Sequence, residues 1–220
     1  MPKAQTRIGI FGGTFNPIHN GHVKAAQIIR QRFSLDKVFF IPSFIPPHKE
    51  SVEVASARHR LKMVELATAP FRNFFPSAVE IEAKGRSYSI NTLKKIKKTY
   101  PDAKIFFLLG VDAFLEIETW KDYKNVLEQC SFIIMSRPGF DLADVKGVLN
   151  DTYNPRIRDI SEIDTPVNPE PWIDSIYLVL IDAMDVSSTE IRKRIRIGQS
   201  IEGLVPGSVE YYIKEKGLYR

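Results

Sequence analysis

The sequence predicts an α/β fold in which a parallel sheet is flanked by helices. Short apolar runs alternate along the chain with stretches whose apolar residues repeat at a helical period. Alternation of this kind is typical of a parallel sheet with helices on both faces. With 220 residues, the chain is long enough for one such domain with a substantial core.

The first expected strand contains the apolar run Ile8-Gly9-Ile10-Phe11 and leads directly into a Gly-Gly pair. Strands are expected over 7–12, 37–42, 76–82, 104–109, 131–136 and 176–181. Helices are expected over 20–33, 56–69, 89–99, 140–149, 188–197 and 206–216. The segment from Asp151 to Asp174 contains four prolines, so we expect a long loop there. A single domain over 1–220 follows, with a C-terminal helical part from about residue 188.

Residues 12–22 read Gly-Gly-Thr-Phe-Asn-Pro-Ile-His-Asn-Gly-His and form the most informative stretch of the chain. Gly12 and Gly13 end the first strand, and glycine lets a backbone approach an anion closely. The N-terminus of the following helix presents unpaired N–H groups at the same place. His19 and His22 are three residues apart and share one helix face, where imidazoles can donate to phosphate oxygens. The stretch therefore predicts a phosphate-handling site.

The same histidine spacing also occurs in metal sites. The chain has four histidines and one cysteine in all, and no histidine–carboxylate cluster accompanies the pair. The composition therefore favours phosphate over metal, and we expect no metal site made by protein ligands.

A second motif lies near the C-terminus, where Ser187 and Glu190 form a capping box at a helix start. Ser188, Thr189 and the free amides of that first turn would face an anion, with Arg192 one turn further on. The alternative is an ordinary capped basic helix, since caps of this type open many helices.

Both motifs fall at the carboxyl ends of expected strands, as does the Leu109-Gly110 junction. Ligands of open parallel sheets bind at those ends. The three segments therefore predict a single site.

Composition limits the function classes. The net charge of +5 suits substrates that carry several phosphates. A basic cluster is formed by Lys94, Lys95, Lys97 and Lys98. Its spacing is that of the solvent-exposed face of an amphipathic helix, so no nucleic-acid partner is expected. Neither a signal peptide nor an apolar run of membrane-spanning length is present, and the single cysteine, Cys130, precedes an apolar run. We expect a cytoplasmic enzyme with a buried thiol and no membrane partner.

The stretch 12–22 resembles the signature of the nucleotidyltransferase superfamily, and 186–192 resembles its Ile-Ser-Ser-Thr-x-Ile-Arg element. This resemblance implies a single Rossmann-like domain of the nucleotidyltransferase fold. Further segments resemble the bacterial nicotinate-nucleotide adenylyltransferases: 45–49, 85–93, 109–112 with Trp120, 136–139 and 217–220. Three residues depart from that family's pattern: Asn16 replaces the usual Asp, Ser89 the usual Thr, and Asn91 a common Asp or Gln. Loss of the carboxylate at residue 16 could lower activity.

The family resemblance implies transfer of AMP from ATP to nicotinate mononucleotide, giving deamido-NAD and pyrophosphate. The nucleotide phosphate attacks in line and needs no protein nucleophile, because its second pKa is about 6. Mg²⁺ would accompany ATP. His19, His22 and Arg192 would be catalytic. The implied ATP-binding residues are Gly12, Gly13, Thr14, Phe15, His19, His22, Ser187, Ser188, Thr189 and Arg192.

The resemblance also implies a pyridine end of the site. Trp120 would stack on the ring, and amides around Tyr88 and Ser89 would receive the nicotinate carboxylate. Asp112 would accept from ribose hydroxyls, while Lys49 and Arg137 are candidates for the mononucleotide phosphate.

Three other readings stay open at this point: a different adenylyl- or cytidylyltransferase such as a pantetheine-phosphate adenylyltransferase, a nucleotide-binding module without turnover, and a basic nucleic-acid binder. The sequence does not decide whether the chain forms a homo-oligomer.

Overall fold

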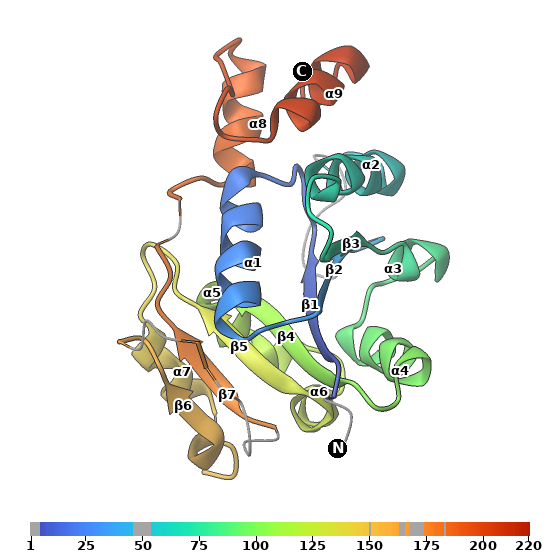
Figure 1. Cartoon of the computed structure of the whole chain (residues 1–220). Coiled ribbons are helices and arrows are strands. Elements are labelled where there is room, and N and C mark those ends of the chain that lie inside the picture. The colour runs from blue at the N-terminus through green and yellow to red at the C-terminus, as the bar shows by residue number, and fades with distance from the viewer. Residues whose placement is uncertain (1–4, 46–53, 150, 163–165, 168–173, 183) are drawn as a thin grey trace.

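The described residues of the computed structural model, 5–45, 54–149, 151–162, 166–167, 174–182 and 184–220, form a seven-stranded parallel sheet. Its strand order is β3-β2-β1-β4-β5-β7-β6, with β4 in the middle and β1 beside it (Figure 1). The strands are β1 Arg7–Gly13, β2 Lys37–Pro42, β3 Phe74–Pro76, β4 Lys104–Gly110, β5 Ser131–Met135, β6 Ile157–Asp159 and β7 Ile176–Val179. The predicted α/β class is confirmed.

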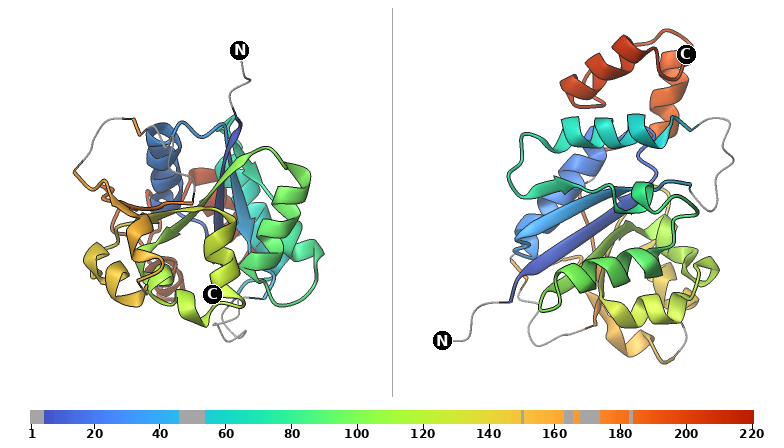
Figure 2. Two further views of the ribbon diagram at one scale, coloured as in Figure 1. Left: turned by 90° about the horizontal axis from the view of Figure 1, so that it is seen from below. Right: turned by 90° about the vertical axis from the view of Figure 1, so that its right-hand side faces the viewer.

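Helices connect the strands and cover both faces of the sheet. The α-helices are α1 Asn20–Arg32, α2 Ala57–Thr68, α3 Val79–Glu82, α4 Ser89–Thr99, α5 Val111–Leu115, α6 Tyr123–Gln129, α7 Val145–Val148, α8 Ser188–Arg196 and α9 Gly207–Lys216. Short 3-10 turns occupy Ile117–Thr119, Leu142–Asp144 and Asn154–Arg156. The right-hand view of Figure 2 shows α9 outside α2 on one side of the sheet, with α4 on the other.

Alternate residues of the central strands belong to two separate hydrophobic cores, one on each face of the sheet. On β1, Phe11 joins the core beneath α1, α2, α8 and α9, whereas Ile10 joins the core beneath α4, α5 and α6. On β4, Leu108 and Phe107 divide in the same way. The period-2 geometry of a strand sends successive side chains to opposite faces, which explains why these strands are apolar throughout.

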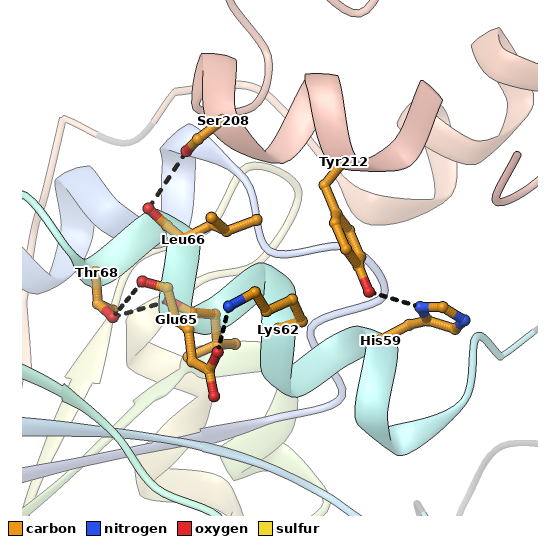
Figure 3. A network of polar contacts seen from close by, with 8 residues as sticks. His59, Lys62, Glu65, Leu66, Thr68, Ser208 and Tyr212 are labelled. Atoms are coloured by element: carbon orange, nitrogen blue, oxygen red, sulfur yellow. Dashed lines mark hydrogen bonds and ion pairs between the residues drawn. The ribbon is translucent and has the colours of Figure 1, made fainter. Parts of the chain in front are cut away.

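The C-terminal helices extend the first of these cores rather than forming a separate one. Ile191 of α8 and Ile213 of α9 are buried in it. On the outer side, Ser208 Oγ donates to the Leu66 carbonyl of α2 at 3.3 Å, and the Tyr212 hydroxyl lies 2.8 Å from His59 Nδ1 (Figure 3). These contacts hold α9 on α2.

One strand prediction, 76–82, is wrong. The strand β3 occupies Phe74–Pro76, and Val79–Glu82 forms the short helix α3. The alternation of Val79 and Ile81 with glutamates mimics a strand, but the Glu82 amide donates to the Ala78 carbonyl at 2.8 Å as in a helical turn. Phe74, which lay outside the prediction, packs its ring 5.1 Å from that of Phe40 and fixes the edge strand.

Further differences concern short elements. The helix expected over 140–149 reduces to the 3-10 turn Leu142–Asp144 and the helix α7. The helices α5 and α6 and the strand β6 were not predicted, because each has too few residues to show a clear period. The strand β6 also interrupts the long loop expected between Asp151 and Asp174.

Among the described residues, no helix combines the length and the apolar character that crossing a membrane would require.

We predict that Cys130 does not react in the folded protein. Its side chain is 3% exposed at the end of α6, and burial raises the pKa of the thiol well above its ordinary value. A thiol-specific disulfide reagent at pH 8 should label no cysteine in the native protein and one in denaturant. Rapid labelling of the native protein would contradict this packing.

Candidate active site

The two histidines of the 12–22 motif lie at the first turn of α1, with their rings stacked. The ring centroids are 3.6 Å apart and the planes are inclined by 30°. His19 is the N-cap residue, and its backbone N–H donates to Nδ1 of His22 at 3.2 Å. Because Nδ1 of His22 accepts, the proton of a neutral His22 ring lies on Nε2. The sequence placed both rings on one face, and the structure confirms this.

The His19 imidazole is kept uncharged by its surroundings. The residue is 7% exposed, and Nδ1 has no hydrogen-bond partner among the described residues. Burial, and second the guanidinium of Arg137, lower the pKa of His19 from 6.5 to about 3. His19 is therefore a neutral ring at physiological pH, and its Nδ1 is enclosed beside Gly21.

Close packing at Gly21 joins this motif to the segment before α8. A Cβ atom on Gly21 would lie 2.9 Å from Cγ1 of Val186 and 3.1 Å from Nδ1 of His19. Any larger residue would displace the His19 ring or the approaching segment. Figure 1 shows α8 standing end to end with α1 at this point.

Hydrogen bonds join the same two segments. Ser188 Oγ donates to the Pro17 carbonyl at 2.8 Å, and Nη1 of Arg192 donates to the Asn16 carbonyl at 3.0 Å. Ser187 caps α8 as predicted, accepting from the Glu190 amide at 3.1 Å. The structure thus brings together two motifs that are far apart in sequence, and it assigns the Ser188 hydroxyl proton to a protein carbonyl.

The turn that is predicted to bind phosphate follows β1. Gly12 and Gly13 are the last residues of that strand, and Thr14 and Phe15 come next. Phe15 has a left-handed φ of 49° and is 2% exposed. Its ring packs edge-on to His22 with centroids 5.1 Å apart. Phe15 therefore packs against the His22 ring and helps to hold it in place. Its side chain is positioned for this packing and not for polar contact with a nucleotide.

Asn16 connects this turn to two other parts of the chain. The residue is 4% exposed, and its Oδ1 accepts from the Ala55 amide at 3.0 Å and from the Tyr219 hydroxyl at 2.8 Å. The departure from the usual Asp therefore keeps the acceptor oxygen at this position.

Arg60 is a residue that the sequence analysis missed. No role was predicted for it, yet it is 1% exposed. Its guanidinium donates to three carbonyls: Ala55 at 2.9 Å, Thr14 at 2.8 Å and Phe44 at 3.0 Å. Burial lowers the pKa of this guanidinium. The sequence does contain a signal of this burial, because Arg60 lies at a helical spacing from the buried residues Met63, Val64 and Ala67.

The predicted pyridine end is built from the N-terminus of α4 and the turn after α5. Tyr88 is the N-cap of α4 and Ser89 its first residue. Trp120 is half-buried and packs edge-on to Phe107, with centroids 5.8 Å apart. Its neighbour Lys121 places Nζ 4.5 Å from the centre of the Tyr88 ring. These two segments therefore adjoin, as the prediction requires.

The predicted ribose and phosphate residues at this end form an ion pair. Nη1 of Arg137 contacts Oδ2 of Asp112, and both side chains are partly exposed. Gly110 makes room for this carboxylate, because a Cβ atom on Gly110 would collide with Oδ1 of Asp112. The influence of Arg137 on His19 shows that the pair lies within electrostatic reach of the histidines. Lys49 lies outside the described residues.

Within the described part of the chain, no three histidine, cysteine, aspartate or glutamate side chains gather as a metal-ligand set.

Comparison with known proteins matches residues 10–194 to the cytidylyltransferase-like family. A protein of Desulfitobacterium hafniense named "Probable nicotinate-nucleotide adenylyltransferase" is 42% identical over 97% of this chain and 96% of its own length. A protein of the same name in Desulfatibacillum aliphaticivorans is 42% identical over 97% and 99%. This chain belongs to the nicotinate-nucleotide adenylyltransferases.

Solved structures agree on the fold of this adenylyltransferase. The nicotinic acid mononucleotide adenylyltransferase of Plasmodium falciparum, complexed with NaAD, superposes with a TM-score of 0.73. The sequences are 20% identical, and the match covers 98% of each chain. The resemblance predicted from the sequence is thus confirmed for both family and fold.

We predict that the His19 ring of the ligand-free adenylyltransferase does not titrate near neutral pH. Its lowered pKa means that the folded state binds fewer protons than the unfolded state below about pH 6.5. The free energy of unfolding should therefore fall as the pH is lowered from about 6.5 towards 3, by on the order of 1–2 kcal/mol at pH 5.

Nuclear magnetic resonance of the ring protons, assigned by their loss in His19→Asn, gives the direct readout. A midpoint for His19 between pH 6 and 7 would show that the ring is solvated instead.

Proposed function

We propose that this chain transfers the adenylyl group of ATP to nicotinate mononucleotide, releasing pyrophosphate and forming deamido-NAD. The observation that supports this most directly is the convergence of His19, His22 and Arg192 at the facing N-termini of α1 and α8. Helix N-termini and neutral imidazoles are suited to a polyphosphate that gains charge during the reaction. The names of the relatives supply the acceptor.

In this proposal the mononucleotide phosphate attacks the α-phosphorus of ATP in line. The phosphate dianion is itself the nucleophile, so no covalent enzyme intermediate forms. His22 donates from Nε2 to the oxygens on which charge develops, while its Nδ1 is held by the His19 amide. Catalysis then rests on positioning and charge stabilisation.

Arg192 would hold the β- and γ-phosphates that leave as pyrophosphate. Its Nη1 is fixed on the Asn16 carbonyl, and Nη2 lies 3.5 Å from Oγ1 of Thr189. The exposed Thr189 hydroxyl and the first-turn amides of α8 are the other donors on this side of the proposed site.

Mg²⁺ fits this site as a companion of ATP rather than as a resident ion. The described residues offer no carboxylate cluster for it, whereas Mg²⁺ keeps most of its waters and binds readily through substrate phosphates. Its contribution would be to neutralise charge on the triphosphate. We also retain the cytoplasm as the proposed compartment, where the free, buried Cys130 would stay reduced.

The acid-over-amide preference would come from the N-terminus of α4. Backbone amides after Tyr88 favour an anion such as the nicotinate carboxylate, and Trp120 offers a ring face nearby. Arg137 of the ion pair would then bind the mononucleotide phosphate, and Asp112 would accept hydrogen bonds from the ribose hydroxyls.

The substrate assignment predicts a strong preference for the acid form of the acceptor. Pyrophosphate release with ATP and Mg²⁺ should be fast with nicotinate mononucleotide and much slower with nicotinamide mononucleotide. Equal rates would refute the amide-lined carboxylate pocket while leaving the transferase intact. No release with either acceptor, from folded protein that binds ATP, would refute the proposed activity.

The role of His22 predicts that His22→Ala lowers kcat by about 10²- to 10³-fold, as for loss of one donor to a developing oxyanion. The KM values should change little, because the donation strengthens in the transition state. His59→Asn is the matched control, since it removes a histidine from α2, outside the proposed site. A His22→Ala enzyme within tenfold of wild-type kcat would rule out this role.

A further inference from the structure

Tyr219, the penultimate residue, reaches back from the end of the chain to the turn beside the active site. Its hydroxyl donates to Oδ1 of Asn16 at 2.8 Å, although 203 residues separate the two. Asn16 is 4% exposed, so this bond is largely sheltered from solvent. Burial raises the pKa of the Tyr219 hydroxyl well above its ordinary value, which keeps the proton in place for donation.

The chain reverses direction at the end of α9, and this reversal leads Tyr219 back towards Asn16. Gly217 adopts a left-handed φ of 58° after the helix, and the Leu218 amide donates back to the Ile213 carbonyl at 3.0 Å. This Schellman arrangement reverses the chain and packs Leu218 against the core. Tyr219 then takes a left-handed φ of 67°, which is uncommon for a residue other than glycine. The tail is therefore held in one specific conformation.

The hydrogen bond from Tyr219 also restrains Arg192, because both residues bond to Asn16. While its side chain accepts from Tyr219 and from the Ala55 amide, its backbone carbonyl accepts from Nη1 of Arg192. Arg192 and the tail thus hold the same residue from two sides. A rotation of Asn16 would move the carbonyl on which the guanidinium rests.

We propose that Tyr219 is a positioning residue for the phosphate end of the ATP site, acting through Asn16 on Arg192. The inference rests on the proposed function in assigning the β- and γ-phosphates to Arg192. It goes further in giving the C-terminal tail a part in nucleotide binding. Tyr219 does not itself touch the nucleotide.

The chain offers a matched control in Tyr212. It lies on α9, and its hydroxyl contacts Nδ1 of His59 of α2, at 2.8 Å, instead of Asn16 (Figure 3). The substitutions Tyr219→Phe and Tyr212→Phe each remove one hydroxyl that ties the C-terminal segment to the body of the protein. Only the first removes a bond to Asn16. A purely structural role for the tail predicts the same outcome for both variants.

The experiment measures the Kd of ATP with Mg²⁺ by calorimetry in the absence of acceptor, for the full-length wild type and both variants. Tyr219→Phe should weaken ATP binding about threefold to tenfold, because the free energy of one buried hydrogen bond corresponds to about this factor and limits what the release of Asn16 can cost the placement of Arg192. Its KM for nicotinate mononucleotide should stay within twofold of wild type. Tyr212→Phe should leave the Kd of ATP within twofold. Thermal unfolding checks that both variants are folded.

A double-mutant cycle isolates the route through Asn16. In an Asn16→Ala background, Tyr219→Phe should weaken ATP binding no further. An equal loss in both backgrounds, or equal ATP affinities for Tyr219→Phe and Tyr212→Phe, would overturn the proposal. If Asn16→Ala does not fold, the comparison of the two tyrosine variants still decides.

Failure of the proposed function would appear separately, as absent turnover in a wild type that binds ATP.

Discussion

The geometry of the site depends most on the hydrogen bonds that the buried guanidinium of Arg60 donates to three carbonyls. Its three carbonyl partners belong to the turn after β1, the segment after β2 and the segment before α2. The first two of these segments leave the sheet at its carboxyl edge, and the three carbonyls are all acceptors, so they need a donor from elsewhere. One planar cation with donors in a fixed fork satisfies all three.

The influence of Arg60 extends to both ends of the proposed substrate. Thr14 leads into the histidine motif at the phosphate end. Phe44 donates its amide to Ser87 Oγ at 2.8 Å, and Ser87 precedes Tyr88 at the pyridine end. Arg60 therefore links the segments that lead to the two ends of the site. A buried cation is costly when no carboxylate is bonded to it, and none of the described carboxylates bonds to Arg60. The three carbonyl bonds offset part of this cost and hold the loops in one arrangement.

The sequence analysis predicted the long elements and the two phosphate motifs, because their periods and caps are local signals. The helix starts at Asn20 and Ser188 follow directly from the residues that precede them. Residue type gave no sign of the role of Arg60, since arginine is usually solvated, and only its helical spacing from Met63, Val64 and Ala67 indicates burial. The link from Tyr219 to Asn16 depends on tertiary packing, and no spacing in the sequence encodes it.

The charge arrangement of the site explains why His19 is neutral although the ligand of the site is anionic. The Arg137 side chain is 48% exposed, whereas His19 is buried. A charged imidazole there would be desolvated and repelled by Arg137. An arriving polyphosphate would oppose both effects, because a nearby anion favours the protonated form. Binding of substrate, rather than the empty protein, would therefore supply any positive charge on His19.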